Sequence, residues 1–253
     1  MDSVATLTTN VLYPDGRKET GEAAVISEHA LNVIVNEQLL YRLVCTKSNL
    51  RELVAGRLLT DGFIEKVEDI YKIFFCKYEN EANVLLNSDI SSGISFNEKA
   101  VNVPTCCTGN RAFFLNNRGD VPEKIPEHDW KQEWVFGLAE EFRRGARIHD
   151  MTGASHICIL AREGKTVFAG EDIGRHNAVD KAVGYALLNG IPLSECMVFT
   201  SGRVPVDMVE KVIAAGIPVL VSKSVPTAES VELAKKYNLT LICKAWPDRC
   251  EVY

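Results

Sequence analysis

Apolar and polar residues alternate through much of the first ninety positions, a period-two pattern that is typical of half-buried strands. Residues 31–35 alternate, the pair Asn36-Glu37 can form a turn, and residues 39–43 alternate again. Residues 7–12 lead into Pro14-Asp15-Gly16, a turn sequence in which proline presets φ and glycine accepts a positive φ. These patterns predict β-hairpins, and residues 71–78 with 84–86 predict another.

One helix interrupts these strands. An apolar stripe at Leu50, Leu53, Val54 and Leu58 has helical spacing. Asn49 and Glu52 resemble a capping box at its start, and Gly62 can end it. We therefore expect a helix that begins at residue 49 and ends near residue 62.

Helical and strand-like patterns alternate in the second half of the chain. Large apolar residues recur at every fourth position from Trp130 to Phe142, which predicts an amphipathic helix over residues 129–144. A hairpin of residues 156–161 and 166–169 around Glu163-Gly164 follows. The alternation then continues with helices at 177–189, 205–216 and 227–237 and strands at 197–200, 219–221 and 239–243.

This order of elements predicts an α/β protein with a three-layer αβα arrangement and a mixed sheet that is parallel in its last strands. A smaller β-rich lobe precedes it. We place the N-terminal lobe at residues 1–103 and the αβα lobe at residues 104–253. Residues 97–126 show no periodicity and predict a loop between the two lobes.

The composition restricts the classes of function. Of 253 residues, 46% are hydrophobic and 25% are charged, which excludes a disordered chain and a disulfide-dominated mini-protein. The net charge of -6 argues against a general nucleic-acid coat and against a binder of anionic membranes. The sequence shows neither a signal peptide nor an apolar stretch long enough to cross a bilayer, so we expect a cytoplasmic protein.

The chain contains eight cysteines. Cys106 and Cys107 are adjacent, and four interpretations remain open: a vicinal disulfide, zinc ligands, a buried inert pair, or a reactive thiolate on an exposed loop. A reducing cytosol disfavours the disulfide, and no second pair of suitably spaced ligands completes a zinc site. The others stand alone, and we interpret them as small apolar residues of the core: Cys45, Cys76, Cys158, Cys196, Cys243 and Cys250.

Polar and cationic residues follow each of the last three predicted strands. Ligands of open α/β sheets bind beyond the carboxyl ends of parallel strands, where helix N-termini favour anions. Cations and hydroxyls gathered there predict a site for a phosphorylated ligand, and Trp246 can stack on a base. The candidate residues are Ser201, Arg203, Ser222, Lys223, Lys244 and Arg249.

The densest run of ionisable residues lies at positions 171–181. Asp172 or Asn177 can cap the helix that follows, so part of this run is ordinary capping chemistry. Capping does not explain Arg175 and His176, because the N-terminus of a helix disfavours cations. We therefore expect an anionic partner for Arg175 and His176 and add them to the predicted site.

Several blocks of the second half form a recognisable set. The first is His149-Asp150-Met151-Thr152-Gly153, and the others are residues 171–181, 200–203 with 208–211, 215–224 and 239–242. Together these blocks resemble the FdhD/NarQ family, whose members are formate dehydrogenase accessory sulfurtransferases. They occur in the family's order and cover most of the second lobe, and Ala154 replaces the more usual glycine after Gly153.

This resemblance implies a cytidine-deaminase-like αβα fold, a homodimer and a role as a sulfur carrier. Such a protein accepts sulfur from a cysteine desulfurase as a cysteine persulfide and transfers it to the bis(molybdopterin guanine dinucleotide) cofactor of molybdenum or tungsten. Formate dehydrogenase is the recipient of that cofactor. The resemblance implies no tightly held metal of the carrier's own.

The resemblance also assigns roles to residues. The family's persulfide cysteine falls in the loop of Cys106 and Cys107. Many members have two cysteines separated by two residues, and the register after Thr105 favours Cys107, with Cys106 second. The resemblance places cofactor contacts at Lys244, Ala245, Trp246, Pro247, Asp248 and Arg249, which join Arg203, Ser201, Lys223, Ser222, Arg175 and His176 in the predicted site.

Two other functions compete with sulfur transfer. Zinc deaminases need H-x-E and P-C-x-x-C motifs, but His176 is followed by Asn177-Ala178, and Pro104 is followed by Thr105. A deaminase is therefore disfavoured. The second alternative is a non-catalytic chaperone that binds and delivers the guanine-dinucleotide cofactor.

Overall fold

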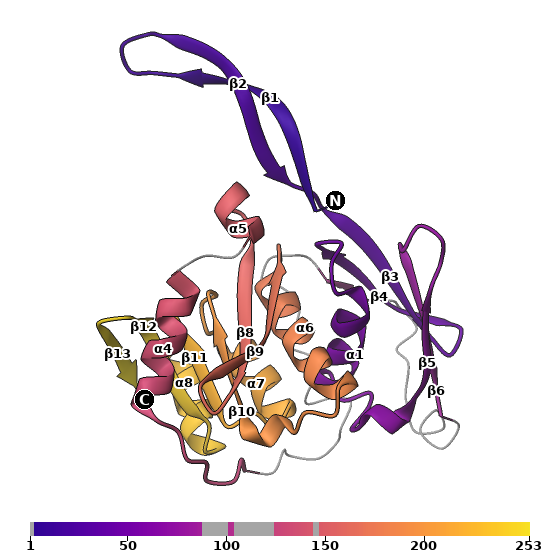
Figure 1. Ribbon diagram of the computed structural model, residues 1–253. Helices are drawn as coiled ribbons and strands as arrows, with labels where there is room; N and C mark the ends of the chain where they lie inside the picture. The colour runs from indigo at the N-terminus through magenta and orange to yellow at the C-terminus, as the bar shows by residue number, and fades with distance from the viewer. Residues whose placement is uncertain (1–2, 88–100, 104–123, 144–146) are drawn as a thin grey trace.

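The computed structural model describes residues 3–87, 101–103, 124–143 and 147–253, and the strands of these residues form three sheets (Figure 1). The largest sheet has the order β13-β12-β11-β10-β8-β9. Neighbours among β10, β11 and β12 are parallel, whereas β8, β9 and β13 are antiparallel to their neighbours, which confirms the predicted mixed sheet. Its strands are β8 (His156–Arg162), β9 (Lys165–Asp172), β10 (Cys196–Thr200), β11 (Val219–Ser222), β12 (Thr240–Trp246) and β13 (Arg249–Val252).

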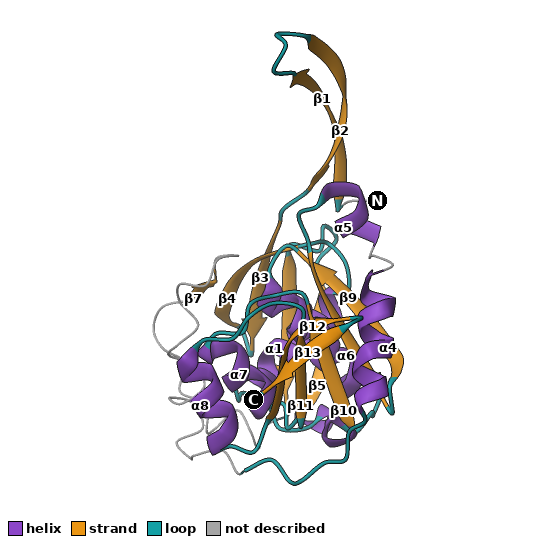
Figure 2. Cartoon of the chain, turned by 90° about the vertical axis from the view of Figure 1, so that its left-hand side faces the viewer, coloured by secondary structure: helices purple, strands orange, loops and turns teal. Residues whose placement is uncertain are grey.

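Helices cover both faces of this sheet (Figure 2). Side chains of a strand point alternately to opposite faces, so Met197 and Phe199 pack with helix α4, whereas Val198 packs on the other side. The predicted αβα layers are confirmed. The helices are α4 (Gln132–Arg143) on one face and α6 (Arg175–Leu188), α7 (Val206–Ala214) and α8 (Ala228–Lys236) on the other.

A second sheet, with the order β5-β6-β3-β4-β7, lies beside these layers. Helix α1 (Leu50–Thr60) lies between this sheet and α6 (Figure 1). Leu43, Leu53 and Val179 belong to one continuous hydrophobic core, so the sheet, α1 and α6 pack as one unit. The strands are β3 (His29–Val35), β4 (Gln38–Cys45), β5 (Ile70–Phe75), β6 (Glu81–Leu86) and β7 (Val101–Val103).

The remaining strands form a ribbon that extends away from the body (Figure 1). β1 (Val4–Leu12) and β2 (Lys18–Ile26) pair antiparallel around the predicted turn. The short helix α5 (Arg147–Thr152) lies against β2. The described residues also form two 3-10 turns, η1 (Val67–Asp69) and η2 (Leu193–Glu195). No helix in the described ranges combines the length and the apolar character needed to cross a membrane.

The predicted hairpins and helices are confirmed, but several details differ. Asn49 has a positive φ of 50° and its side chain makes no capping bond, so the predicted capping box at α1 is wrong. Helix α6 begins at Arg175 with Gly174 as N-cap, two positions before the predicted start. Short elements were missed: α5, β13 and β7, the last of which lies in the predicted loop at 97–126.

Two glycines allow α1 and α6 to cross closely. A Cβ atom on Gly56 would collide with the carbonyl oxygen of Asp180, and one on Gly184 would collide with that of Glu52. Backbone atoms cannot move away without moving a whole helix, so any side chain at these positions separates the helices. The crossing therefore requires glycine on both helices.

Gly184→Ala is expected to destabilise the protein by about 1–3 kcal/mol or more, because the added methyl group overpacks the helix crossing. Thermal unfolding should show a melting temperature that is lower by roughly 2–4 °C per kcal/mol. Gly137→Ala is the matched control, because this position on α4 is exposed and a Cβ there meets no atom within 4 Å. Equal melting temperatures for the two variants would contradict the close crossing.

Candidate functional site

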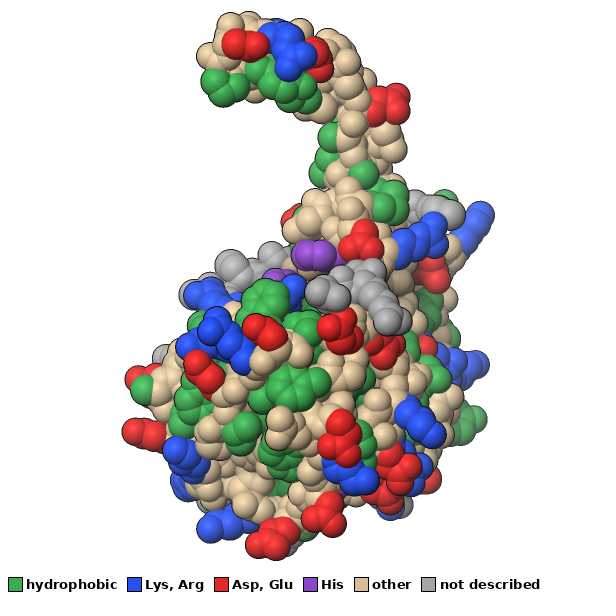
Figure 3. Space-filling model, turned by 60° about the vertical axis from the view of Figure 1, so that its left-hand side comes forward, with side chains coloured by type: hydrophobic (Ala, Val, Ile, Leu, Met, Phe, Trp, Pro, Cys, Tyr) green, Lys and Arg blue, Asp and Glu red, His purple; other side chains and the backbone are tan. Residues whose placement is uncertain are grey.

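A cavity of about 400 Å³ opens at the carboxyl ends of β10 and β11. It lies between α4, α5, the start of β8 and the loops that follow β10 and β11. Figure 3 shows histidine side chains on the surface below the β1–β2 ribbon. Its volume is in the range of small-molecule sites, roughly 300–1,000 Å³. Side chains that line it include Phe142, His149, Asp150, His156, Ser201 and Lys223.

Ser201 connects the loop after β10 to the first residues of β8. Its Oγ accepts a hydrogen bond of 3.1 Å from the backbone N–H of Ile157, which leaves the hydroxyl hydrogen for Nδ1 of His156 at 3.1 Å. Burial lowers the pKa of His156, and the positive charge of Arg175 lowers it further. His156 is therefore a neutral imidazole at neutral pH, held in place at the cavity wall.

Ser222 connects the two loops at the edge of the sheet. Its hydroxyl donates to the carbonyl oxygen of Gly202 at 2.7 Å and accepts from the N–H of Ser224 at 2.9 Å. The residue is fully buried. Ser222 therefore holds the loops together, and its predicted contact with a ligand is not tested by this geometry.

Lys223 brings together the loop after β11, the end of β12 and helix α4. Its Nζ lies 4.7 Å from the ring centroid of Trp246 and 5.9 Å from that of Phe142. Both distances are within the range of cation–π attraction. Trp246 is 40% exposed, so an aromatic face and an ammonium group lie together beside the cavity.

The segment after the last parallel strand differs from the prediction. Residues 244–249 were expected to form a loop, but Lys244, Ala245 and Trp246 complete β12, and Arg249 pairs with Trp246 as the first residue of β13. Lys244 forms an ion pair of 2.9 Å with Glu251. β13 has only four residues, two of them charged, so no apolar alternation identifies it in the sequence.

The three cationic loops lie side by side at one edge of the sheet, because the backbone N–H of Lys223 bonds to the carbonyl oxygen of Thr200 and that of Lys244 bonds to the carbonyl oxygen of Ser224. That their cations bind one ligand stays a prediction. Of the cations in these loops, Lys223 lines the cavity within the described part of the chain. Arg203 and Arg249 are exposed, and Ala245 is buried against α4. Pro247 and Asp248 lie at the turn of the β12–β13 hairpin. Their contact with a ligand stays a prediction.

Arg175 and His176 lie under the loop after β10. Arg175 is buried, and a Cβ on Gly202 would lie 2.9 Å from its Cβ, so only glycine permits this packing. His176 Nε2 lies 3.3 Å from Oδ2 of Asp207. Burial lowers the pKa of His176 despite the opposing effect of Asp207. Arg175 and His176 are therefore buried at the start of α6, beneath the loop that follows β10.

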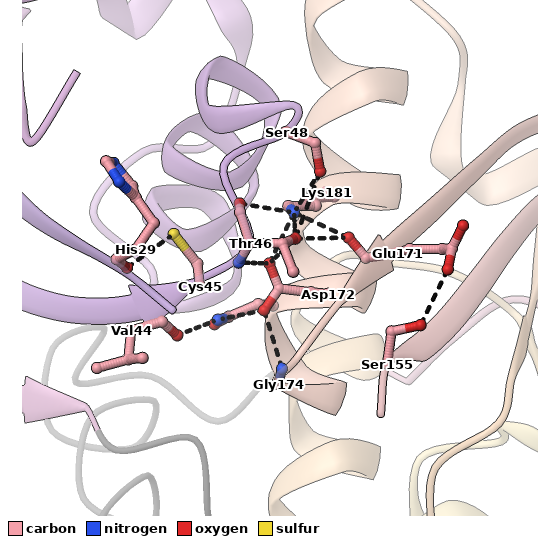
Figure 4. Close-up of polar contacts among 11 residues, drawn as sticks. His29, Val44, Cys45, Thr46, Ser48, Ser155, Glu171, Asp172, Gly174 and Lys181 are labelled. Carbon is pink, nitrogen blue, oxygen red and sulfur yellow. Dashed lines mark hydrogen bonds and ion pairs between the residues drawn. The ribbon is translucent and has the colours of Figure 1, made fainter. Parts of the chain in front are cut away.

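A buried network connects the N-terminal part to the base of the site (Figure 4). Lys181 Nζ lies 2.6 Å from Oδ2 of Asp172 and donates to Oγ1 of Thr46 at 2.8 Å. Asp172 also accepts from the backbone N–H groups of Thr46 and Gly174 and from Nδ2 of Asn177. No pattern along the chain singles out Thr46, because Asp172 and Lys181 are more than a hundred residues away from it.

Glu171 holds helix α5 beside the cavity. Its carboxylate accepts from the backbone N–H groups of Ile148 at 3.1 Å and His149 at 2.9 Å, and from the hydroxyl of Ser155 at 2.9 Å. Figure 4 shows the bond to Ser155. His149 and Asp150 line the cavity as a result, although the sequence analysis assigned neither to the site.

The eight cysteines fall into three groups: two outside the described residues, four that are buried and two that are half-buried. Cys106 and Cys107, the predicted sulfur acceptors, lie outside the described residues. Burial raises the pKa of Cys45 and Cys243 to about 12, which confirms these thiols as core residues. Cys158 and Cys196 are also buried, with a raised pKa.

Cys76 does not fit the interpretation of a buried core thiol. It is half-buried at the turn between β5 and β6. Desolvation acts to raise its pKa, but the backbone N–H groups of Tyr78, Glu81 and Asn80 outweigh this and lower the pKa. Cys250 is also half-buried, but its pKa is raised by burial.

Lys181→Met is expected to destabilise the protein by about 3–5 kcal/mol, because it leaves the buried carboxylate of Asp172 without its cation. Urea unfolding at a fixed protein concentration measures the loss. Lys165→Met removes an exposed lysine from β9 and should change stability by less than about 0.5 kcal/mol. The double variant Asp172→Asn/Lys181→Met should lose less free energy of unfolding than the two single variants lose together. Additive losses would contradict the pairing.

The chain is similar to known proteins over most of its length. The FdhD/NarQ family model matches residues 26–253. The chain is 28% identical over 234 residues to the "Sulfur carrier protein FdhD" of Staphylococcus aureus (strain MRSA252), covering 92% of this chain and 88% of the relative. The protein of the same name from Halalkalibacterium halodurans is 29% identical over 222 residues, covering 87% and 82%.

A solved structure has the same fold. A crystal structure described as a formate dehydrogenase accessory protein from Desulfotalea psychrophila superposes with a TM-score of 0.78, covers 99% of this chain and 96% of its own, and is 24% identical. At this identity the likeness concerns the fold. Because the family model spans nearly the whole chain, this protein belongs to the FdhD/NarQ family.

Proposed function

We propose that this protein is a sulfur carrier required for formate dehydrogenase activity. It accepts sulfur from a cysteine desulfurase as a persulfide on Cys107, with Cys106 as the second candidate, and transfers it to the bis(molybdopterin guanine dinucleotide) cofactor before insertion into formate dehydrogenase. The observation that carries this proposal is the match along most of the chain to proteins named sulfur carriers. The proposed site of action is the cytoplasm, and the proposed assembly is a homodimer.

The cavity supports binding of the cofactor as a substrate. A guanine dinucleotide carries phosphates and a flat base, and the site offers an ammonium group at Lys223, a hydrogen-bond donor at Nε2 of His156, and an aromatic face at Trp246. The contacts with the rings hold the ammonium of Lys223 in place, where it can pair with a phosphate. The cavity is large enough for one nucleotide of the cofactor.

The sulfur transfer proceeds in two steps. In the first, the thiolate of Cys107 attacks the terminal sulfur of the donor's persulfide, a new S–S bond forms, and the donor's cysteine leaves as a thiolate. In the second, the terminal sulfur passes to the metal of the bound substrate and the Cys107 thiolate is released. The sulfane sulfur becomes sulfide, and the metal ion gives up the two electrons that this requires.

The described thiols favour this assignment. Four of them are buried with a raised pKa and therefore lack the thiolate that attacks a persulfide: Cys45, Cys158, Cys196 and Cys243. Cys76 has a lowered pKa, so it is the described thiol against which Cys106 and Cys107 must be tested.

Incubation with a cysteine desulfurase and cysteine is expected to add roughly 32 Da, the mass of one sulfur atom, to the intact protein. Mass spectrometry should show that Cys107→Ala abolishes this addition and that Cys45→Ser, a change in the core, leaves it intact. An adduct that persists in Cys107→Ala and disappears in Cys76→Ser would move the acceptor to the β5–β6 turn. No adduct on any cysteine would leave only the cofactor-delivering chaperone.

Lys223→Ala is expected to weaken binding of GDP, which represents the nucleotide end of the cofactor, by about tenfold, because it removes a charged hydrogen-bond donor. Isothermal titration calorimetry measures this affinity. Lys235→Ala, at an exposed position of α8 on the other face of the sheet, is the matched control and should bind as the unchanged protein does. Unchanged affinity in Lys223→Ala would exclude the cavity as the nucleotide site.

A further inference from the structure

We propose that Asp150 reads the base of the nucleotide in this cavity and selects guanine. This inference rests on the proposed function, which supplies a guanine nucleotide as the ligand, and it adds a residue that determines specificity. Asp150 lies in α5, is exposed and lines the cavity.

The position of Asp150 is fixed by its neighbours. Glu171 binds the N–H groups of Ile148 and His149, and Oγ1 of Thr152 donates to the carbonyl oxygen of Ile148 at 2.8 Å. His149 Nδ1 lies 2.8 Å from the carbonyl oxygen of Ser155 and donates to it. These bonds hold the turn of α5 on both sides of Asp150, so its carboxylate is presented to the cavity from a well-supported backbone.

Among the described residues that line the cavity, Asp150 is the one carboxylate. The other polar side chains of the wall are hydroxyls, imidazoles and the ammonium of Lys223. A phosphate is not expected to bind beside the carboxylate of Asp150, because the two negative charges repel each other. Asp150 therefore suits a part of the ligand that donates hydrogen bonds, whereas Lys223 suits the part that carries negative charge.

Guanine supplies the complementary pattern. An ionised carboxylate is an acceptor only and can take two parallel N–H bonds. Guanine offers two neighbouring donors on one edge, N1–H and the 2-amino group. Adenine, cytosine and uracil do not present two adjacent donors in their neutral forms, so a carboxylate in this place discriminates against them. The imidazole of His156, which lines the same cavity, adds a surface against which a flat base can pack.

The test exchanges the pattern of acceptors and donors at this position. In Asp150→Asn one oxygen of the carboxylate is replaced by an NH₂ group, which donates. The variant should lose GDP affinity by about tenfold or more, in line with the discrimination of a bidentate contact to a base. It should instead prefer xanthosine diphosphate, because xanthine has a carbonyl oxygen where guanine has the 2-amino group. A gain of binding cannot arise from unfolding.

Calorimetry with GDP, inosine diphosphate, xanthosine diphosphate and ADP gives the outcomes. The unchanged protein should bind GDP about tenfold more tightly than inosine diphosphate, which lacks the 2-amino group. Glu232→Gln, an exposed acid on α8, is the matched control and should keep the selectivity of the unchanged protein. If Asp150→Asn keeps that selectivity while GDP still binds, the role of Asp150 is overturned and the proposed function stands. If the unchanged protein binds none of these nucleotides, cofactor binding is overturned as well.

Discussion

The buried ion pair between Asp172 and Lys181 determines how the parts of this protein meet. Lys181 is fully buried, and a charge in such a place is tolerated only when it is paired and hydrogen-bonded. Its partners come from the end of β9 and from Thr46, which follows β4. The same carboxylate bonds to Gly174 and Asn177 and so defines the entrance of α6. One pair therefore fixes both the contact between the two sheets and the base of the cavity.

A continuous set of contacts leads from this entrance to the cavity wall. Arg175 at the start of α6 packs under Gly202, and the carbonyl oxygen of Gly202 accepts a hydrogen bond from the hydroxyl of Ser222. Lys223 follows Ser222 in the chain, so its place beside Trp246 depends on contacts that begin in the core. Buried polar groups thus hold the loops of the site in one conformation. This is the preorganisation that a binding site needs.

Local patterns predicted most of the fold, because hairpins and amphipathic helices repeat with periods that the sequence displays. The elements that were missed are short: β7 has three residues, β13 has four and α5 has six. Such lengths hold too few positions to show a period. Asn49 resembled a helix cap, yet its backbone adopts a left-handed conformation that directs the side chain elsewhere. Here tertiary packing decided the geometry, and the sequence near Asn49 does not encode it.

The site was predicted in part. Ser201 and Lys223 were placed correctly at the carboxyl edge of the sheet, because the rule for parallel strands needs only the order of the elements. The ion pair of Lys244 with Glu251 was not foreseen, since it requires the unpredicted strand β13. His149 and Asp150 were part of a recognised motif, but only the bonds from Glu171 bring their helix to the cavity. Contacts between distant elements are the information that patterns along a chain do not contain.

A second buried cluster, between α1, α6 and α7, shows the same principle. Arg57 bonds to Asp61 at 2.6 Å, and Lys211 lies 2.6 Å from Asp180. Two acids and two bases balance within the core, so the helices that carry them are restricted to arrangements that keep every charge paired. Such clusters give little net stability but select one geometry. For the proposed sulfur carrier, the contribution of these paired charges is to keep α1, α6 and α7 in one arrangement.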